Sequence, residues 1–368
     1  MKKITKYLAV IIITAFLMFE INNKIKYIPN ESRGVFISYI EYMNYFKGKK
    51  IEEIKKEIDK IIIETKNNYL NTIYLHVRPF SDSIYNSNIF PFSHTITGIQ
   101  KKEISFDILD YFIKKAHNKN IKVHAWINPY RISNDTDTSF LSKDNPAYKW
   151  LNTNHVKIIE GKGIYYNPAS NKVKELIIKG VVEIVENYDV DGILFDDYFY
   201  PDNTIDLENY KEVENTISLT DYRLSQVNEL ISNVYKKIKE INQSVLFGIS
   251  PDGNIDNNYN THYADVKKWL SEINYVDYIM PQIYYGFIHE TKPFIETINE
   301  WNNLIKKDIK LIPVLALYKV GEIDNYAGSG KNEWVETSDL IKKQIQVSRN
   351  MSKYDGFSLF RYEYLLKK

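Results

Sequence analysis

Residues 173–201 read VKELIIKGVVEIVENYDVDGILFDDYFYP, a helical pattern followed directly by a strand pattern. From Val173 to Val185, apolar side chains recur at positions i, i+3, i+4, i+7 and i+8, the period of one helix face. The predicted strand, residues 192–199, opens on the apolar run GILF, and such unbroken runs are typical of parallel strands buried on both faces. This stretch therefore predicts one helix–strand unit of an α/β fold.

The same alternation extends along the whole chain. The predicted strands are residues 34–40, 72–80, 122–131, 192–199, 246–252, 276–287, 311–318 and 356–362, and the predicted helices are residues 51–66, 106–118, 173–187, 221–241, 263–273, 293–305 and 339–351. Eight strands alternating with helices predict a (β/α)8, or TIM, barrel. A doubly wound sheet is the alternative, but no Gly-x-Gly-x-x-Gly follows the first strand. Little sequence follows the eighth strand, so we expect the eighth helix to be short or missing.

Composition narrows the class of protein. The chain has 368 residues, and the 44% that are hydrophobic suffice for one large core. Lysine plus arginine (48) nearly equals aspartate plus glutamate (47). The chain therefore has no large excess of positive charge that would attract a polyanion, and we expect no nucleic-acid partner. The absence of cysteine excludes disulfides, thiolate nucleophiles and cysteine metal sites. The oligomeric state is left open.

The N-terminus has the pattern of an export signal. Lys2, Lys3 and Lys6 precede an apolar run at residues 7–19, and no small-x-small cleavage site follows. We therefore predict a signal anchor or a signal peptide at residues 1–23, a linker at 24–33 and a catalytic barrel at 34–368. The lysines precede the apolar run, which places the barrel outside the cytoplasm. We expect a cell-envelope protein, anchored to the outer face of the cytoplasmic membrane or secreted.

Barrel active sites lie at the carboxyl ends of the strands, so polar and aromatic residues at those ends are the candidates. A bare barrel needs no polar residues there, whereas a cleft that binds a sugar does. The candidates are Arg78, His124, Trp126, Asn128, Tyr130, Arg131, Asp196, Asp197, Tyr198, Asp252, Gln282, Tyr284 and Arg361.

The pair Asp196-Asp197 is the most specific of these features. Glycoside cleavage needs one carboxyl that protonates the leaving oxygen and a second group that supports the oxocarbenium-like centre. Adjacent carboxylates raise the pKa of one member, which suits an acid at neutral pH. They also suit a substrate-assisted route, in which one orients an N-acetyl group of the substrate as the nucleophile. The alternative is structural: Asp197 caps a loop or helix and Asp196 pairs with an arginine.

Other candidates suggest subsites around this pair. His124, Trp126 and Asn128 alternate along one predicted strand and so share one side, as a sugar-binding wall or as ordinary core. Arg78 and Arg131 either bind a carboxylate of the substrate or form a salt bridge to Asp196 or Asp252. No His-x-x-x-His or similar ligand spacing appears, so we expect neither a metal nor a cofactor.

Five ordered motifs resemble those of one known family. They are TIYLHVRPF from residue 72, HAWINPYR from 124, DGILFDDYFYP from 191, GISP from 248 and MPQIYY from 280. Over residues 33–361 the chain resembles the glycosyl hydrolase-like 10 family of bacterial envelope proteins. The resemblance implies a barrel hydrolase acting on glycans, with peptide-free peptidoglycan strands as the substrate class. It implies Asp196 and Asp197 as catalytic carboxylates, and it implies cleft-lining roles for Arg78, His124, Asn128, Arg131, Gln282 and Tyr284.

The chain departs from the family pattern in three places. Residues 99–105 lack the usual glycine-rich loop, Asp252 replaces an aromatic residue, and the lipoprotein cysteine is absent. Asp252 therefore becomes a third acidic candidate, and attachment through lipid is not inherited.

The sequence leaves a second class of function open beside the glycoside hydrolase. The chain could instead be a catalytically silent carbohydrate-binding barrel that scaffolds cell-wall enzymes. A deacetylase-like metal enzyme is disfavoured by the scarcity of clustered ligands.

Overall fold

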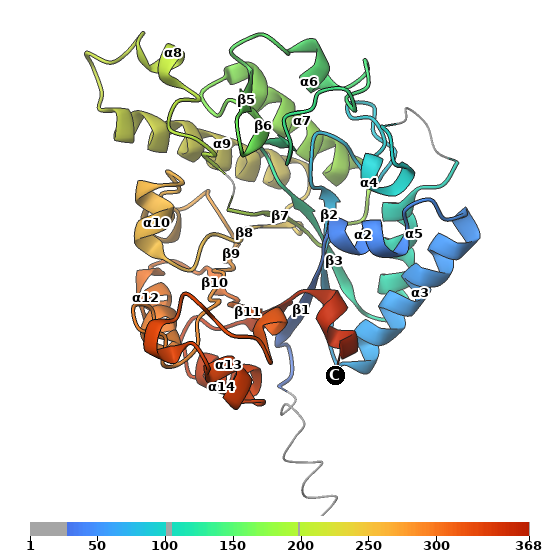
Figure 1. Ribbon diagram of the computed structural model, residues 1–368, viewed down its shortest axis with the longest axis vertical. Helices are drawn as coiled ribbons and strands as arrows, with labels where there is room; N and C mark the ends of the chain where they lie inside the picture. The colour runs from blue at the N-terminus through green and yellow to red at the C-terminus, as the bar shows by residue number, and fades with distance from the viewer. Residues whose placement is uncertain (1–27, 101–104, 198, 368) are drawn as a thin grey trace, which may run out of the picture. The chain divides into compact units, whose positions relative to one another are not determined.

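The computed structural model describes residues 28–100, 105–197 and 199–367 (Figure 1). It divides into two compact units, Met1–Glu31 and Ser32–Lys368, and the second holds every helix and strand described below. The predicted export segment, residues 1–23, lies outside the described residues. Within the described ranges, no helix combines the length and the apolar character needed to cross a membrane.

The second unit is built on a parallel sheet that closes on itself. Its order is β10-β9-β8-β7-β3-β2-β1-β12-β11, and every neighbouring pair is parallel. The strands are β1 (Ser32–Ile37), β2 (Thr72–Arg78), β3 (Lys122–Ile127), β7 (Gly192–Phe195), β8 (Leu246–Ile249), β9 (Tyr278–Ile279), β10 (Lys310–Leu311), β11 (Val314–Ala316) and β12 (Gly356–Phe360).

The first and last strands of that order are two pieces of the predicted seventh strand. They are separated only by Ile312 and Pro313, which still take part in the sheet. The backbone N–H of Ile312 donates to Ile279 on one side, and Pro313 accepts from Ser358 on the other. The predicted (β/α)8 barrel is therefore confirmed, with strand seven interrupted at its proline.

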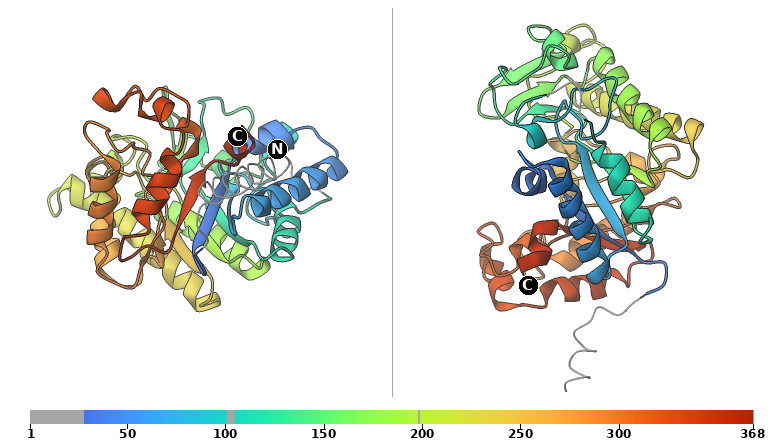
Figure 2. Two further views of the ribbon diagram at one scale, coloured as in Figure 1. Left: turned by 90° about the horizontal axis from the view of Figure 1, so that it is seen from below. Right: turned by 90° about the vertical axis from the view of Figure 1, so that its right-hand side faces the viewer.

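All seven predicted helices are present, on the outside of the sheet (Figures 1 and 2). They are α3 (Ile51–Asn67), α5 (Ile108–His117), α7 (Asn171–Asn187), α9 (Leu219–Ile241), α11 (Val266–Ser271), α12 (Phe294–Leu304) and α14 (Leu340–Ser348). In α7, the hydroxyl of Ser170 accepts from the N–H of Val173, and the apolar stripe is buried. The 3-10 helix η3 (Tyr362–Lys367) stands in the place of the short eighth helix.

The predicted strands run too far at their carboxyl ends. The strand predicted at residues 34–40 ends at Ile37, because Ser38 and Glu41 form a capping box that starts a helix. Likewise, the strand predicted at 122–131 stops at Ile127, and Arg131 begins a separate small sheet. The excess residues lie in the connections that carry the candidate site.

Short unpredicted elements fill these connections. The helices are α2 (Tyr39–Tyr45), α4 (His94–Thr97), α6 (Pro146–Lys149), α8 (Leu207–Tyr210), α10 (Ile255–Asn260), α13 (Glu333–Glu336), η1 (Leu317–Lys319) and η2 (Gly328–Gly330). A small antiparallel sheet, in the order β4-β6-β5, comprises β4 (Arg131–Ser133), β5 (Val156–Ile159) and β6 (Gly163–Tyr166). Each of them follows the carboxyl end of a barrel strand, so together they surround the end of the barrel where active sites form.

Large side chains fill the barrel interior and require small neighbours. The interior cluster comprises Phe36, Tyr74, Trp126, Leu194, Tyr278, Met280, Ile312 and Val314. At Gly248 on β8, an added Cβ would lie 2.2 Å from the ring of Tyr278. That ring cannot move freely, because its hydroxyl lies 2.8 Å from His124 Nδ1 and donates to the Ile193 carbonyl.

We therefore expect Gly248→Ala to destabilise the fold. The new methyl group overpacks a closed interior, and such changes cost about 1–3 kcal/mol of unfolding free energy. Urea unfolding followed by tryptophan fluorescence measures the change as a lower midpoint. An unchanged midpoint would show that Tyr278 relaxes and that the interior is not closely packed there.

Candidate active site

The acidic motif that dominates the sequence lies along β7, and its carboxylates fall at opposite ends of that strand. Asp191 precedes the strand, where Oδ2 accepts from the backbone N–H of Val123 at 2.8 Å and lies 2.9 Å from His117 Nε2. Asp196 and Asp197 follow the strand, at the carboxyl end of the barrel. Asp191 thus ties strands together at the amino end, and only the other two belong to the candidate site.

Asp196 is buried and held by side chains that extend from β3. Its Oδ2 accepts from Trp126 Nε1 at 3.1 Å and from Asn128 Nδ2 at 3.2 Å. The amide of Asn128 is itself oriented, because its Oδ1 accepts from the backbone N–H of Arg131. His76 stacks on the indole of Trp126 with 3.5 Å between ring centroids. The carboxylate orientation is therefore fixed by two donors, each of which is fixed in turn.

Asp197 faces a different set of residues, from the ends of β8 and β9. Burial raises the pKa of its carboxyl; His262 and the hydrogen bond from Gln282 oppose this rise, and the carboxylate of Asp252 adds to it. Asp252 and Gln282 are paired by an isolated parallel bridge, so they lie side by side. The two adjacent aspartates thus occupy distinct surroundings, and Asp197, whose pKa is raised, is suited to donate a proton.

Asp252 is anchored in a turn beside Asp197. Its Oδ1 accepts from the backbone N–H of Asn254 at 2.7 Å, and its Oδ2 accepts from Asn257 Nδ2 at 2.5 Å. His262 Nε2 lies 4.0 Å from the same Oδ2. Asp252 therefore acts on Asp197 as a fixed neighbouring charge.

The structure places His124 and Tyr130 away from the two aspartates. His124 pairs in register with Gly192 at the start of β7, below the layer of Trp126 and Leu194. Burial lowers the pKa of His124 to about 4, so its imidazole is neutral at pH 7 and bonds to the hydroxyl of Tyr278. Tyr130 is fully buried in the main hydrophobic core. Both side chains act in packing.

Arg78 and Arg361 also point elsewhere. A bulge between His76 and Arg78 interrupts the alternation of β2, and the guanidinium of Arg78 lies 4.3 Å from the ring centre of Phe90. It packs against α7, where a Cβ at Gly180 would come within 2.0 Å of Nη1.

Arg361 instead joins the last strand to α2. Its guanidinium pairs with the buried Glu41 at 2.5 Å and with Glu363 at 2.9 Å. This contact connects the element after β1 to the element after β12, next to the point where the sheet closes. The positive charge of Arg361 therefore compensates these two carboxylates and stabilises the fold.

Tyr284 contributes to an aromatic group at the other side of the barrel end. Its ring centroid lies 5.7 Å from that of Tyr318 and 5.9 Å from that of Phe360. Tyr198 lies outside the described residues. Of the sequence candidates, the structure thus brings together Trp126, Asn128 and Asp196 in one group and Asp197, Asp252 and Gln282 in another.

Comparison with known proteins assigns the class of this protein. The sequence model of the family described as Glycosyl hydrolase-like 10 matches residues 31–334. The chain belongs to the glycosyl hydrolase-like 10 family. It is a glycoside hydrolase.

Curated relatives agree with this assignment, and a solved structure shares the fold. The hydrolase is 29% identical over its whole length to glycosyl hydrolase YngK of Bacillus subtilis (strain 168), covering 75% of that protein. It is 30% identical to glycosyl hydrolase DigH of Escherichia coli (strain K12), over 81% of this chain and 73% of the relative. The PgaB (BpsB) glycoside hydrolase domain from Bordetella bronchiseptica matches 92% of the chain and 96% of that domain at 10% identity, with a TM-score of 0.58. At that identity the last likeness shows the fold alone.

Sequence reasoning left two histidines out of the candidate site residues. His76 follows the strand alternation, but its fully buried ring was not distinguishable from core. His262 lies between α10 and α11, away from any strand end, and no periodic pattern marks it. Among the described residues, no group of three or more histidines or acids is arranged to hold a metal ion.

The connection that follows Asp197 is anchored from α9. Arg223 is buried and donates from Nε and Nη2 to the carboxylate of Asp206, at 2.9 and 2.7 Å, and from Nη2 to the Asn203 carbonyl at 2.6 Å. Its Nη1 donates to the hydroxyl of Tyr263, the neighbour of His262. One guanidinium therefore fixes both the segment after Asp197 and the segment that carries His262.

Proposed function

We propose that this glycoside hydrolase cleaves the β-linked, N-acetylated glycan of peptidoglycan strands from which the peptides have been removed. The observation that carries the proposal is the division of Asp196 and Asp197 between two sets of partners. One carboxylate is held by the donors Trp126 and Asn128, and the other has a raised pKa beside Gln282. Glycoside cleavage requires two such different groups. The family likeness supplies the substrate class.

The two carboxyls have separate roles in this proposal. Asp197 protonates the glycosidic oxygen as the bond to the leaving sugar breaks, and it then takes a proton from the attacking water. Asp196 orients the N-acetyl group of the substrate, whose carbonyl oxygen attacks the anomeric carbon. The contacts from Trp126 and Asn128 support this role, because they prevent the carboxylate from rotating away.

Incubation of residues 31–368 with peptide-free glycan strands tests the proposed substrate. Mass spectrometry of the early products is expected to show shorter N-acetylated fragments with the wild type, and far fewer with Asp196→Asn or Asp197→Asn. Binding of the strands by both variants serves as the control for folding. Binding by the wild type without any fragments would contradict the proposal.

We also propose that the hydrolase is exported, through the segment at residues 1–23. Its lysines and apolar run support this localisation. The full chain expressed in a bacterial host is expected to be degraded by protease added to intact spheroplasts. Protection from that protease until the cells are lysed would contradict export.

The surroundings of Asp197 predict opposite shifts of the pH profile in two variants. A general acid works below its pKa, so activity is lost as the pH rises through that value. His262 lowers the pKa of Asp197, so His262→Gln is expected to move the alkaline limb of kcat/KM to higher pH. Asp252 raises that pKa, so Asp252→Asn is expected to move the limb to lower pH.

Profiles of kcat/KM against pH measure both shifts on one substrate. His155→Gln is the matched control, since His155 bonds to Ser170 on α7's N-terminal side and has no part in the group around Asp197. Shifts of the same sign in both site variants would show that Asp197 is not the acid.

A further inference from the structure

A cavity of about 800 Å³ lies between two connections at the carboxyl end of the barrel. Residues 85–92, after β2, line its first wall, and Asp144, Pro146, Lys149 and Trp150, in and around α6, line its second wall. The volume falls within the range of about 300–1,000 Å³ that small-molecule sites occupy. Neither aspartate group contributes a lining residue, so the cavity is separate from the proposed catalytic residues.

The first wall is fixed by hydrogen bonds to α7 and within itself. The carboxylate of Glu183 on α7 accepts from Ser87 Oγ and from the backbone N–H of Asn88, both at 2.6 Å. The hydroxyl oxygen of Ser87 accepts in turn from the backbone N–H groups of Ile89 and Phe90, at 3.0 and 2.9 Å. This wall therefore keeps its shape without a ligand.

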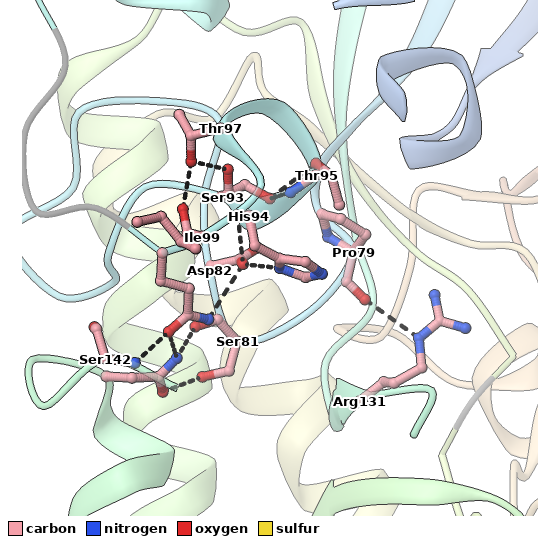
Figure 3. Close-up of polar contacts among 12 residues, drawn as sticks. Pro79, Ser81, Asp82, Ser93, His94, Thr95, Thr97, Ile99, Arg131 and Ser142 are labelled. Atoms are coloured by element: carbon pink, nitrogen blue, oxygen red, sulfur yellow. Dashed lines mark hydrogen bonds and ion pairs between the residues drawn. The ribbon is translucent and has the colours of Figure 1, made fainter. Parts of the chain in front are cut away.

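A buried polar network joins the second wall to the start of the first (Figure 3). Asn145, which caps α6, donates from Nδ2 to the Ser81 carbonyl at 2.7 Å, and its Oδ1 accepts from Ser81 Oγ at 2.9 Å. The Oε1 of Gln100 accepts from Asn145 Nδ2 and from the backbone N–H of Ser142, and its Nε2 donates to Asp82. Because Ser81 and Asp82 begin the connection that forms the first wall, the two walls are held at a fixed separation. A preformed cavity lowers the cost of ordering that binding would otherwise incur.

Trp150 provides an aromatic surface in the second wall. Its side chain is half-buried, and its ring centroid lies 5.3 Å from that of His155 and 6.0 Å from that of Tyr166, both in edge contacts. An indole held in this way presents a rigid apolar surface to the cavity. Such a surface suits the C–H face of a sugar ring.

Four exposed polar residues line the same cavity: Asn86, Asn88, Asp144 and Lys149. None of their side chains forms a hydrogen bond or an ion pair with the part of the chain that the structure describes. Two amides, one carboxylate and one ammonium supply both donors and acceptors for hydroxyl groups. The acid and the base offset each other's charge, so the lining favours a neutral ligand over a phosphate.

We propose that this cavity is a second saccharide-binding site, which binds the glycan chain outside the catalytic centre. An aromatic surface surrounded by uncommitted amides matches a ligand that has an apolar ring face and a rim of hydroxyl groups. Asp144 is the only acid among the lining residues, and glycoside cleavage requires two groups, so the chain is bound there without being cleaved. The inference takes its glycan from the proposed function and goes beyond that function.

Affinity electrophoresis through a gel that contains peptide-free strands tests the second site, in the Asp197→Asn background so that cleavage is slow. Trp150→Ala is expected to raise the dissociation constant about 5- to 20-fold, because a sugar ring loses its aromatic contact. Asn88→Ala is expected to raise it about 2- to 10-fold, the effect of losing one hydrogen bond. Tyr148→Ala is the matched control and is expected to leave it unchanged, since Tyr148 is an exposed aromatic residue of α6 that does not line the cavity.

The two cavity variants separate a binding effect from a folding effect. The side chain of Asn88 makes no hydrogen bond to the described protein, so its removal reports on the ligand alone. Dissociation constants for both cavity variants equal to that of Tyr148→Ala would overturn the second site and leave the proposed function standing. A change in Trp150→Ala alone, together with a lower urea midpoint, would also overturn it.

The same experiment distinguishes the second site from the proposed function. Weaker binding in both cavity variants, together with no cleavage of the strands by the wild type, would support the second site and contradict the proposed function. Strands that do not bind the Asp197→Asn chain at all would overturn both.

Discussion

Asp197→Asn is expected to lower kcat/KM on glycan strands by about 10²–10⁴-fold, the contribution of a positioned general acid. The same variant is expected to lose far less activity on a nitrophenyl glycoside of an N-acetylated disaccharide. Nitrophenolate leaves without being protonated, so removing the acid does not affect that bond cleavage. The amide that replaces the carboxyl can still accept from Gln282, so the surroundings are preserved.

Asp196→Asn is the matched comparison, and it is expected to lose activity on both substrates. Its proposed role, orienting the N-acetyl group, is needed whatever the leaving group is. Initial rates of the two variants on the two substrates give four values. For each variant, the loss of activity on the glycan strands divided by the loss on the nitrophenyl glycoside separates the roles of the two carboxyls. Equal losses for the two variants on the activated substrate would contradict the division of labour between the carboxyls.

Asp206→Ala is expected to cause the largest loss of stability of any change considered. It leaves the guanidinium of Arg223 buried without its carboxylate, and breaking a buried pair in this way costs about 3–5 kcal/mol. Asp206 and Arg223 are both buried, so solvent does not replace the lost partner. Because Arg223 also holds Asn203 and Tyr263, the segments that carry Asp197 and His262 are expected to loosen before the barrel unfolds.

Urea unfolding measures this loss, and kcat at a temperature below unfolding measures the effect on the site. Asp110→Ala is the control, since Asp110 forms an exposed pair with Lys114. Removing such a pair is expected to cost about 0.5 kcal/mol or less. Similar losses in the two variants would show that the Arg223 anchor adds nothing beyond a surface contact.

The barrel was predictable because its elements obey strong periodicities. Strands such as Gly192–Phe195 are buried on both faces, and α7 presents one apolar stripe, so hydrophobic pattern alone marks them. The short helices at the barrel end carry no such signal. The helix α6 has four residues, barely more than one turn, and the start of α2 lies inside the run 34–40 that the apolar pattern assigned to a strand.

The candidate site was predictable where strand geometry stays regular. Trp126 and Asn128 meet Asp196 because alternation along β3 and its extension puts them on one side. Alternation predicts the same for His76 and Arg78, but the bulge between them sends Arg78 to α7. A loop residue such as His262 reaches the site through tertiary packing, which no local pattern encodes.

The most direct test of hydrolysis by Asp196 and Asp197 is mass spectrometry of the products formed from peptide-free strands in water enriched in oxygen-18. Hydrolysis incorporates one solvent oxygen into each pair of new ends. The account predicts that every new reducing end carries a single heavy oxygen with the wild-type enzyme, and that these products are absent with Asp196→Asn. New anhydro ends without solvent oxygen, or an equal yield of labelled ends from Asp196→Asn, would contradict it.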